Sequence, residues 1–326
     1  MNAVDHNNVV IFDDRGIPSI MCRFVRPKDT EEVPAVFKIG DKVADAIYIS
    51  KYPNIVIDGR AYSMPMADPT VNITFDEAVQ ACRCKGLGWH LMTAVEYEYL
   101  LNQSREKGTM PHGNTDWGKD YYHNEEQGKV SNLGRTYTGT GPVTWNHDHT
   151  PYGVSDLNGN VWEWLAGLRI KDGVIEFIPG NKAASPYCDL SKDSTEWQQA
   201  ETSKGPVRAN VECGEITITD AVAADDYEPN YDGVRIEELE VKLSEIPQVL
   251  KDLGIIPDKR AEEEGKTYVY FDATEGEYLP LRGSAFGNAS YSGPSALDLL
   301  DPRSGSDDSV GFRSAFYEVN GKLITE

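Results

Sequence analysis

Short apolar runs and turn-forming residues alternate through the first 45 positions of the chain. The runs VVIF, IMCRFV and VFKIG are separated by Pro, Asp and Gly. Short apolar runs between turn formers are typical of β-strands. We therefore predict a small strand-rich segment over residues 1–45, either an attachment module or the first strands of the main domain.

Two later stretches have the pattern of capped helices. Thr74 with Glu77, and Thr93 with Glu96, have the spacing in which a threonine and a glutamate cap the first turn of a helix reciprocally. Apolar residues follow each pair at helical spacing, and the second run continues towards Gly108, a residue suited to end a helix. We predict two helices at these positions.

The pattern then becomes irregular. Residues 108–160 are rich in Gly, Asn, Asp, Thr and His with scattered Trp and Tyr, and such a stretch needs aromatic packing or a metal to hold it. Residues 168–278 have the character of an acidic insertion, with a helix predicted from Ser244 to Gly254 and a buried strand at 268–271. Residues 279–317 are rich in Gly and Ser, which predicts two short strands around a long surface loop.

Charge narrows the classes of partner. The net charge is −22 and the pI about 4.6. Nucleic-acid binding requires a basic stripe, and none is visible, so we expect no nucleic-acid partner. No run approaches the roughly 18 apolar residues that span a bilayer, and the first residues lack the pattern of a secretory signal. An acidic surface suits solubility, a cationic partner or a divalent metal.

The cysteines do not form a disulfide pattern. There are five, an odd number at scattered spacing, and Cys82 and Cys84 stand two residues apart in a predicted helix, where they face different ways. We predict free thiols made in a reducing cytoplasm.

The segment DLNGNVWEW combines a turn with an aromatic strand. Asp156 to Gly159 have turn chemistry, and Trp162 and Trp164 share one face of a strand. Glu163 is predicted to point the opposite way, towards the loop or solvent. By itself this pattern indicates a tight turn into a buried strand.

Four pieces in this order resemble the formylglycine-generating enzyme (sulfatase-modifying factor) family: VNITFDEAVQAC, GWHLMTAVEYEYLL, YGVSDLNGNVWEWLAG, and LRGSAF closed by VGFRSAF. The resemblance implies an α+β, C-type lectin-like fold of the formylglycine-generating-enzyme type, with two helices, short antiparallel strands and much irregular loop. It places one domain over residues 46–326, with the insertion at about 168–278.

The same resemblance implies a structural calcium ion at the turn. The carried-over ligands are Asn158, Gly159, Val161 and Glu163. Backbone oxygens and one carboxylate suit this hard cation.

Catalysis is not expected. The oxidase chemistry of the family depends on a C-terminal cysteine pair that binds copper, and thiolates suit Cu(I), but the chain has no cysteine after Cys213. A related branch uses iron held by histidines of an N-terminal helical domain, whereas residues 1–45 contain only His6. His147 and His149 share a face in an extended segment, yet hydrogen bonds within a loop are the simpler interpretation.

The C-terminal block also resembles the variable region of diversity-generating retroelement proteins such as phage tropism determinants. The shared pattern is Arg282-Gly283, a loop, Arg303-Ser304, and Gly311-Phe312-Arg313. It implies a ligand-display region at about 282–313 whose surface positions change at little cost to stability. The expected ligand-facing positions are Ala285, Phe286, Asn288, Ser290, Tyr291, Asp298, Asp301 and Asp307.

These observations predict a non-catalytic ligand-binding display protein. Its expected setting is a phage tail or virion, assembled from protein made in the host cytoplasm, and its expected partners are a host cell-surface protein or glycan, other virion tail proteins and further copies of itself. Two alternatives stay open. One is a cytoplasmic, oxygen-dependent metalloenzyme of the formylglycine-generating or non-haem-iron sulfoxide synthase type, and the other is a structural virion or surface domain without a specific ligand.

Overall fold

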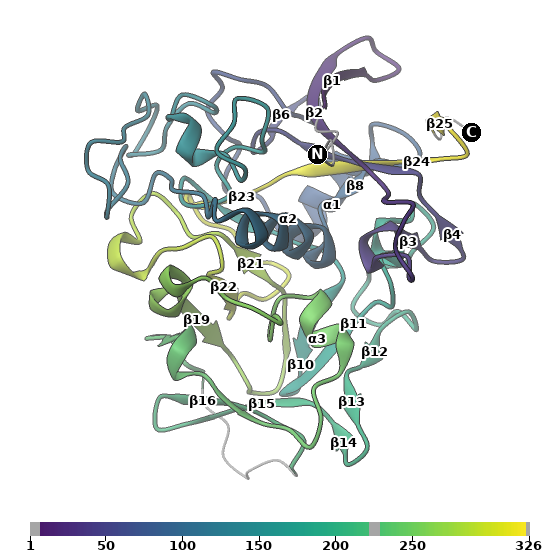
Figure 1. Ribbon diagram of the computed structural model, residues 1–326, viewed down its shortest axis with the longest axis vertical. Coiled ribbons are helices and arrows are strands. Elements are labelled where there is room, and N and C mark those ends of the chain that lie inside the picture. The colour runs from purple at the N-terminus through teal and green to yellow at the C-terminus, as the bar shows by residue number, and fades with distance from the viewer. Residues whose placement is uncertain (1–6, 222–228, 324–326) are drawn as a thin grey trace.

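Strands from the two ends of the chain pair in one sheet. The computed structural model describes residues 7–221 and 229–323, and β1 and β2 pair, through β5, with β24 near the C-terminus (Figure 1). The strands of this first sheet, in order, are β1 (Asn7–Phe12), β2 (Pro18–Val25), β5 (Ala46–Ser50), β24 (Ser314–Val319) and β25 (Lys322–Leu323), with β8 (His90–Leu91) on β24. Strands β1 and β2 of the N-terminal segment therefore belong to the same sheet as β5 and β24.

The two predicted capping boxes begin the two long helices. Helix α1 covers Phe75–Arg83 and α2 covers Ala94–Lys107. The Thr93 hydroxyl accepts the Glu96 backbone N–H at 3.2 Å, and the Glu96 carboxylate accepts the Thr93 N–H at 2.9 Å. Gly108 ends α2 in the left-handed region, at φ 65°. Both helix predictions are confirmed.

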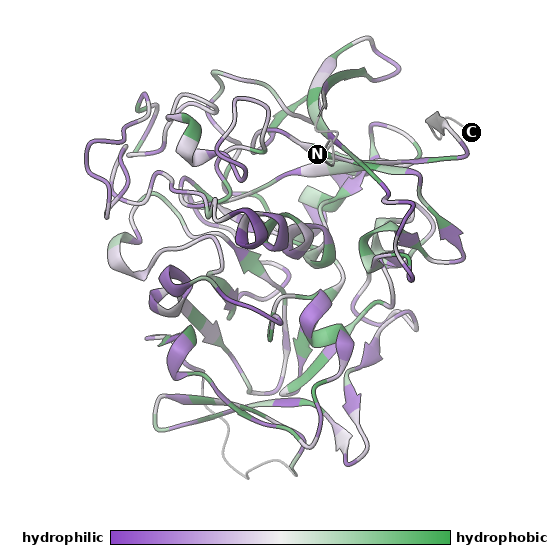
Figure 2. Cartoon of the chain, viewed as in Figure 1, coloured by the Kyte–Doolittle hydropathy of each residue, from purple (hydrophilic) through white to green (hydrophobic). Residues whose placement is uncertain are grey.

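Helix α2 lies in the middle of the molecule although much of it is hydrophilic (Figure 2). Its buried carboxylates have partners, as buried charges require. Glu96 contacts His90 Nε2 at 2.9 Å and Asn181 Nδ2 at 3.0 Å. Glu98 pairs with Arg105 on the same helix, and burial raises the pKa of Glu98 although the neighbouring arginines oppose the shift.

The predicted insertion supplies every described strand of a second sheet. In order these strands are β18 (Glu240–Lys242), β16 (Glu215–Thr219), β15 (Arg208–Glu212), β11 (Val174–Phe177), β10 (Leu168–Lys171) and β20 (Glu277–Tyr278), with β12 (Gln198–Gln199) on β11. Ile170, Ile175 and Ala209 from this sheet are fully buried in one cluster with Leu100 and Leu101 of α2. The insertion thus shares the core of α2.

The helix predicted from Ser244 is shorter than expected. Helix α3 covers Gln248–Asp252 and begins after Pro247, which occupies its N-cap. Ser244 does not cap it, because both its N–H and its hydroxyl donate to Asp220 Oδ2. Ser244 instead connects the chain after β18 to Asp220, which follows β16.

The third sheet connects the DLNGNVWEW strand to the display region. Its order is β17 (Val234–Arg235), β19 (Tyr268–Phe271), β22 (Leu297–Leu299), β21 (Leu281–Arg282), β9 (Trp162–Trp164) and β23 (Val310–Phe312). The predicted strand at 268–271 is confirmed as β19. Strands β21 and β23, at the two ends of the proposed display region, therefore pair with opposite edges of β9.

Short elements complete the description. The hairpins are β3 (Lys38–Ile39) with β4 (Lys42–Val43), β6 (Ile55–Ile57) with β7 (Arg60–Tyr62), and β13 (Glu201–Thr202) with β14 (Gly205–Pro206). The 3₁₀ turns are η1 (Ala35–Phe37), η2 (Val143–Trp145), η3 (Lys182–Ala184), η4 (Ile236–Glu238), η5 (Glu262–Lys266) and η6 (Ala289–Tyr291). Among the described residues, no helix is both long and apolar enough to cross a membrane.

Candidate functional site

The turn before β9 uses left-handed backbone, as its Asp, Asn and Gly residues predict. Asp156, Gly159 and Asn160 have φ values of 60°, 74° and 66°. Only glycine fits at 159, since a Cβ there would lie 2.2 Å from the Asn114 carbonyl oxygen. Asn160 Oδ1 accepts the Thr136 N–H at 2.8 Å. The turn thereby anchors part of the irregular stretch 108–160, for which the sequence predicts no long helix or strand.

Trp162 and Trp164 are buried in the same cluster. Trp164 packs edge-on against Phe75 at 6.0 Å between ring centroids and donates its indole N–H to the Ile73 carbonyl at 2.9 Å. Trp162 meets Tyr270 of β19. The predicted aromatic face is therefore a packing surface, and it joins α1 to the third sheet.

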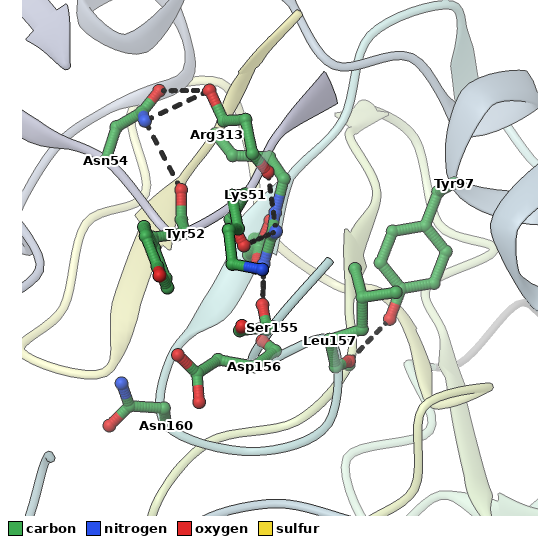
Figure 3. A network of polar contacts seen from close by, with 12 residues as sticks. Lys51, Tyr52, Asn54, Tyr97, Ser155, Asp156, Leu157, Asn160 and Arg313 are labelled. Carbon is green, nitrogen blue, oxygen red and sulfur yellow. Dashed lines mark hydrogen bonds and ion pairs between the residues drawn. The ribbon is translucent and has the colours of Figure 1, made fainter. Parts of the chain in front are cut away.

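Glu163 does not reach the loop or solvent. Its side chain is 2 % exposed and pairs with the fully buried Arg313. Arg313 also donates to the carbonyl oxygens of Ser50 and Ser155, at 3.0 and 3.1 Å. Figure 3 shows the Arg313 side chain directed into this group of backbone oxygens. The expectation of an outward carboxylate is wrong because the guanidinium of Arg313, which lies between β23 and β24, meets it inside the core.

The four predicted calcium ligands have other contacts. Asn158 Nδ2 donates to the Pro111 carbonyl at 3.2 Å, and its Oδ1 accepts the Ser284 hydroxyl at 3.3 Å. The Gly159 carbonyl accepts the Val161 N–H at 2.9 Å, and Glu163 engages Arg313. Calcium at this turn stays a prediction.

Two of the predicted ligand-facing positions are buried. Ala285 is 3 % exposed and Phe286 is 6 % exposed. The Phe286 ring packs edge-on against Trp117, with centroids 5.1 Å apart. Both residues therefore support the loop from beneath, because their side chains turn inward and leave the surface to their neighbours.

The other predicted positions form two groups. Asn288 and Ser290 are half-buried and Tyr291 is 47 % exposed. Asn288 Oδ1 accepts the Ala285 N–H at 2.7 Å, so this side chain also shapes the loop. The second group consists of the carboxylates Asp298, Asp301 and Asp307. Burial, followed by the charge of Asp301, raises the pKa of Asp298 to about 7, and burial, followed by the charge of Asp307, raises the pKa of Asp301.

Backbone hydrogen bonds fasten the first group to an earlier loop. The Trp117 N–H donates to the Phe286 carbonyl at 2.8 Å, and the Ala289 N–H donates to the Thr115 carbonyl at 2.8 Å. Trp117 has a φ of 52° and is 62 % exposed. A large residue held in this sparsely populated conformation indicates a constraint imposed by its surroundings.

Exposed aromatic side chains surround the loop. We call this set the aromatic rim; it consists of Trp117, Tyr121, Tyr122 and Tyr291, which are 62, 39, 53 and 47 % exposed. The Tyr122 hydroxyl lies 3.4 Å from the Ser290 carbonyl, and Tyr291 meets the Tyr268 ring at 4.5 Å. The rim therefore joins residues 117–122 to residues 287–291, a segment that we call the display loop.

A cavity of about 340 Å³ opens beside the rim. We call it the His112 cavity. Its walls come from residues 110–123, the β9 turn, η5, and the stretch that follows Tyr291. Among the lining residues are His112, Asp120, Tyr122, His123, Glu263, Glu264, Lys266, Thr267, Ser292 and Pro294.

Buried ion pairs hold the wall made by η5. Glu264 accepts Arg105 Nε and Nη2, at 3.0 and 2.9 Å, and also accepts the Ser295 hydroxyl. These bonds lower the pKa of Glu264 although burial opposes them. Tyr97 of α2 places its hydroxyl 2.8 Å from the Pro294 carbonyl. The insertion, α2 and the display region thus meet at the back of the cavity.

The two histidines considered from the sequence have separate hydrogen-bond partners. His147 is buried, with Nδ1 accepting the Val154 N–H at 2.8 Å, whereas His149 Nε2 lies 3.1 Å from the Met110 carbonyl. Within residues 7–221 and 229–323, no group of three His, Cys, Asp or Glu residues is placed to hold a metal ion.

The rim and the cavity contain residues that sequence reasoning missed. Trp117, Tyr122, His112 and His123 all lie in the irregular stretch 108–160. The available signal was the aromatic and histidine content of a long loop, which indicates a functional segment but does not indicate which residues meet the C-terminal loop.

Comparison with known proteins locates the family resemblance. The sequence model of the sulfatase-modifying factor enzyme 1-like domain matches residues 51–207. The formylglycine-generating enzyme of Mus musculus is 36 % identical over 105 residues, which are 30 % of this chain and 27 % of that enzyme. The match thus spans about a quarter of the enzyme's length. It confirms the predicted resemblance; the family-model match also extends into the predicted insertion and does not include residues 278–317.

Solved structures with similar chains were also found. PvdO from Pseudomonas aeruginosa has a TM-score of 0.41 at 15 % identity, covering 96 % of this chain and 98 % of that chain. Treponema denticola variable protein 1 has a TM-score of 0.36 at 12 % identity, covering 95 % of this chain and 98 % of that chain. The Major Tropism Determinant U1 variant has a TM-score of 0.33 at 12 % identity, covering 93 % of this chain and 59 % of that chain. The chain has the α+β, C-type lectin-like fold of the formylglycine-generating-enzyme type that the sequence predicts.

Proposed function

We propose that this chain is a non-catalytic display protein that binds its ligand through residues 287–291 and the aromatic rim. The observation that carries the proposal is the backbone fastening of Phe286 and Ala289 to residues 115–117. A loop held by main-chain atoms keeps its shape when exposed side chains change, and a preorganised surface loses less entropy on binding. Tyr and Trp supply rigid contact area at such surfaces.

The cysteines support a non-catalytic role. All five are free, and Cys22, Cys82 and Cys188 are buried. Burial raises the pKa of the Cys22 thiol to about 12 and that of Cys188 to about 11. Because the thiolate is both the metal ligand and the nucleophile, these positions are poorly suited to copper chemistry.

The biological setting that we propose is a phage tail or virion, with a protein or glycan of a host cell surface as ligand. The Arg282-Gly283 to Arg313 pattern supports a diversified loop. In the gene, codons rich in adenine at Asn288, Ser290 and Tyr291, with a near-copy repeat beside a reverse-transcriptase gene, are expected. A locus without that repeat contradicts diversification and leaves the binding role intact.

Binding itself is tested with the fluorescently labelled full chain on a panel of bacterial strains, measured by flow cytometry. We expect binding to a subset of strains, lost in Tyr291→Ala and kept in Tyr187→Ala, which removes a more exposed tyrosine (76 % exposed) outside the rim. Equal binding by the two variants contradicts the proposed surface. One redox metal per chain together with oxygen consumption establishes the metalloenzyme instead.

A further inference from the structure

The His112 cavity has the size of a small-molecule site. At about 340 Å³ it lies at the lower end of the range of roughly 300–1,000 Å³ for ligand pockets. Ser292, Gly293 and Pro294, which directly follow the exposed Tyr291, line one side. A ligand chain that crosses the display loop therefore has a recess within reach for one of its units.

Two histidines in the cavity wall are fixed by carboxylates. The rings of His112 and His123 stack with centroids 3.7 Å apart and planes 6° from parallel. His112 Nδ1 lies 3.0 Å from Glu126, and His123 Nδ1 lies 3.1 Å from Asp120. Because a carboxylate engages Nδ1 of each ring, Nε2 is the ring nitrogen that each histidine presents to a ligand. The pair therefore offers two ring nitrogens in fixed positions.

Asp120 is committed to holding this arrangement. Its Oδ1 accepts the N–H groups of Tyr122 and His123, both at 2.8 Å, and its Oδ2 accepts the Gly113 N–H at 3.0 Å. The loop that carries both histidines and Tyr122 is thus folded around one buried carboxylate. Preorganised side chains of this kind favour specific binding.

The cavity combines donors, acceptors and both signs of charge. Glu263 supplies acceptors and Lys266 supplies donors, while Thr267 and Ser292 contribute hydroxyl groups. An anionic ligand would face the carboxylates, and a cationic ligand would face Lys266. A ligand hydroxyl donates and accepts, so a neutral polyhydroxylated molecule uses both kinds of group without either charge conflict.

The aromatic ring of Tyr122 lies at the edge of the cavity. Tyr122 lines the cavity, is 53 % exposed, and contacts the display loop through its hydroxyl. A sugar ring has an apolar C–H face that packs on an aromatic face and hydroxyl edges that need hydrogen bonds. We infer that the His112 cavity binds one neutral sugar residue of a surface glycan, an inference that rests on the proposed binding function.

The test uses the full chain with glucose, galactose, mannose, N-acetylglucosamine and N-acetylgalactosamine, each followed by saturation-transfer NMR and titration. We expect at least one sugar to bind. Losing a charged hydrogen-bond partner in Glu263→Gln should weaken that binding about tenfold. Glu262→Gln, which changes the neighbouring exposed glutamate outside the cavity lining, should leave it unchanged.

The outcomes separate this inference from the proposed function. No binding of any of the five sugars, or equal weakening in both glutamate variants, overturns the sugar site. Binding of the peptide acetyl-Gly-Lys-Gly-amide in place of sugar assigns the cavity to a protein ligand and also overturns it. On cells, we expect periodate oxidation of surface glycans to abolish labelling. Labelling that survives periodate but is lost in Tyr291→Ala overturns the glycan and keeps the display function.

Discussion

The guanidinium of Arg313 donates to both carboxylate oxygens of Glu163, a residue 150 positions earlier, and neither side chain reaches solvent. The Nε–Oε2 distance is 2.6 Å. Glu163→Gln leaves a buried guanidinium without its counter-ion, so we expect the free energy of unfolding to fall by about 3–5 kcal/mol. Urea denaturation of the purified chain measures the loss.

A double variant measures how strongly Glu163 and Arg313 are coupled to each other. Glu163→Gln with Arg313→Met removes both charges and should recover part of the stability lost in the single variant. If the double variant is as unstable as the sum of the single variants, the two residues are not coupled as the geometry indicates.

The capping threonines should differ in importance. Thr74→Ala removes a half-buried cap of α1 and should cost about 1 kcal/mol. Thr93 is 1 % exposed, and its hydroxyl also donates to Asn181 Oδ1 at 2.6 Å. Thr93→Ala strands that buried oxygen and should cost about 1–3 kcal/mol more. Equal losses in thermal denaturation would show that the Asn181 contact contributes little.

Stability should rise with pH because of one buried lysine. Lys85 is 4 % exposed, its Nζ lies 2.8 Å from Ser19 Oγ and 3.2 Å from the Trp89 ring centroid, and burial lowers its pKa to about 7. Between that value and its unfolded pKa of about 10.4, the unfolded chain binds one more proton. The contribution of Lys85 to the free energy of unfolding therefore rises by about 1.4 kcal/mol per pH unit in this range.

Below about pH 7 both states carry the proton, and the folded chain bears the full penalty of a buried ammonium. Urea unfolding at several pH values measures the slope. Lys85→Met should flatten it, whereas Lys28→Met, which changes an exposed lysine, should not. A slope unchanged by Lys85→Met would mean that another group titrates.

The predicted calcium ion is open to a direct measurement. A ligand that binds only the folded state raises the melting temperature by mass action. If Asn158, Gly159, Val161 and Glu163 hold calcium, the melting temperature is higher in calcium chloride than in EDTA, and Glu163→Gln removes the difference. Equal melting temperatures leave Glu163 solely as the partner of Arg313.

Stability and binding should separate within the display loop. Phe286 is 6 % exposed beneath Trp117, so Phe286→Ala should cost about 3–5 kcal/mol. Tyr291→Ala changes an exposed ring and should cost under about 0.5 kcal/mol while abolishing cell binding. Denaturation and flow cytometry on the same preparations compare them. A stable Phe286→Ala variant would contradict the supporting role of this ring.

Local signals were predictable from the sequence. Some features depend only on residues that are neighbours in the sequence. They are the caps at Thr74 and Thr93, the turn at 156–160 and the strand at 268–271. Contacts between distant segments were not predictable. No local pattern around Glu163 predicts its contact with Arg313, and none around Phe286 predicts its contact with Trp117. Each contact joins segments that are far apart in the chain.

The site shows the same division. The sequence marked residues 282–313 as a proposed display region, yet it could not separate inward from outward side chains around 285–291, because this loop is not a strand of period two. The burial of Ala285 and Phe286 follows from a left-handed Ser284, at φ 67°, which redirects the chain after β21.

The pairing of β5 with β24 has a consequence for how the chain acquires its structure. Ser50 and Ser314 lie 3.0 Å apart across 264 residues of sequence. Contacts of such high contact order form late, since the closure of a long loop must precede the stabilising interactions that it brings. During synthesis, β5 therefore has one unpaired edge until Ser314–Val319 have left the ribosome, and a chain that stalls before that point presents a strand edge open to aggregation.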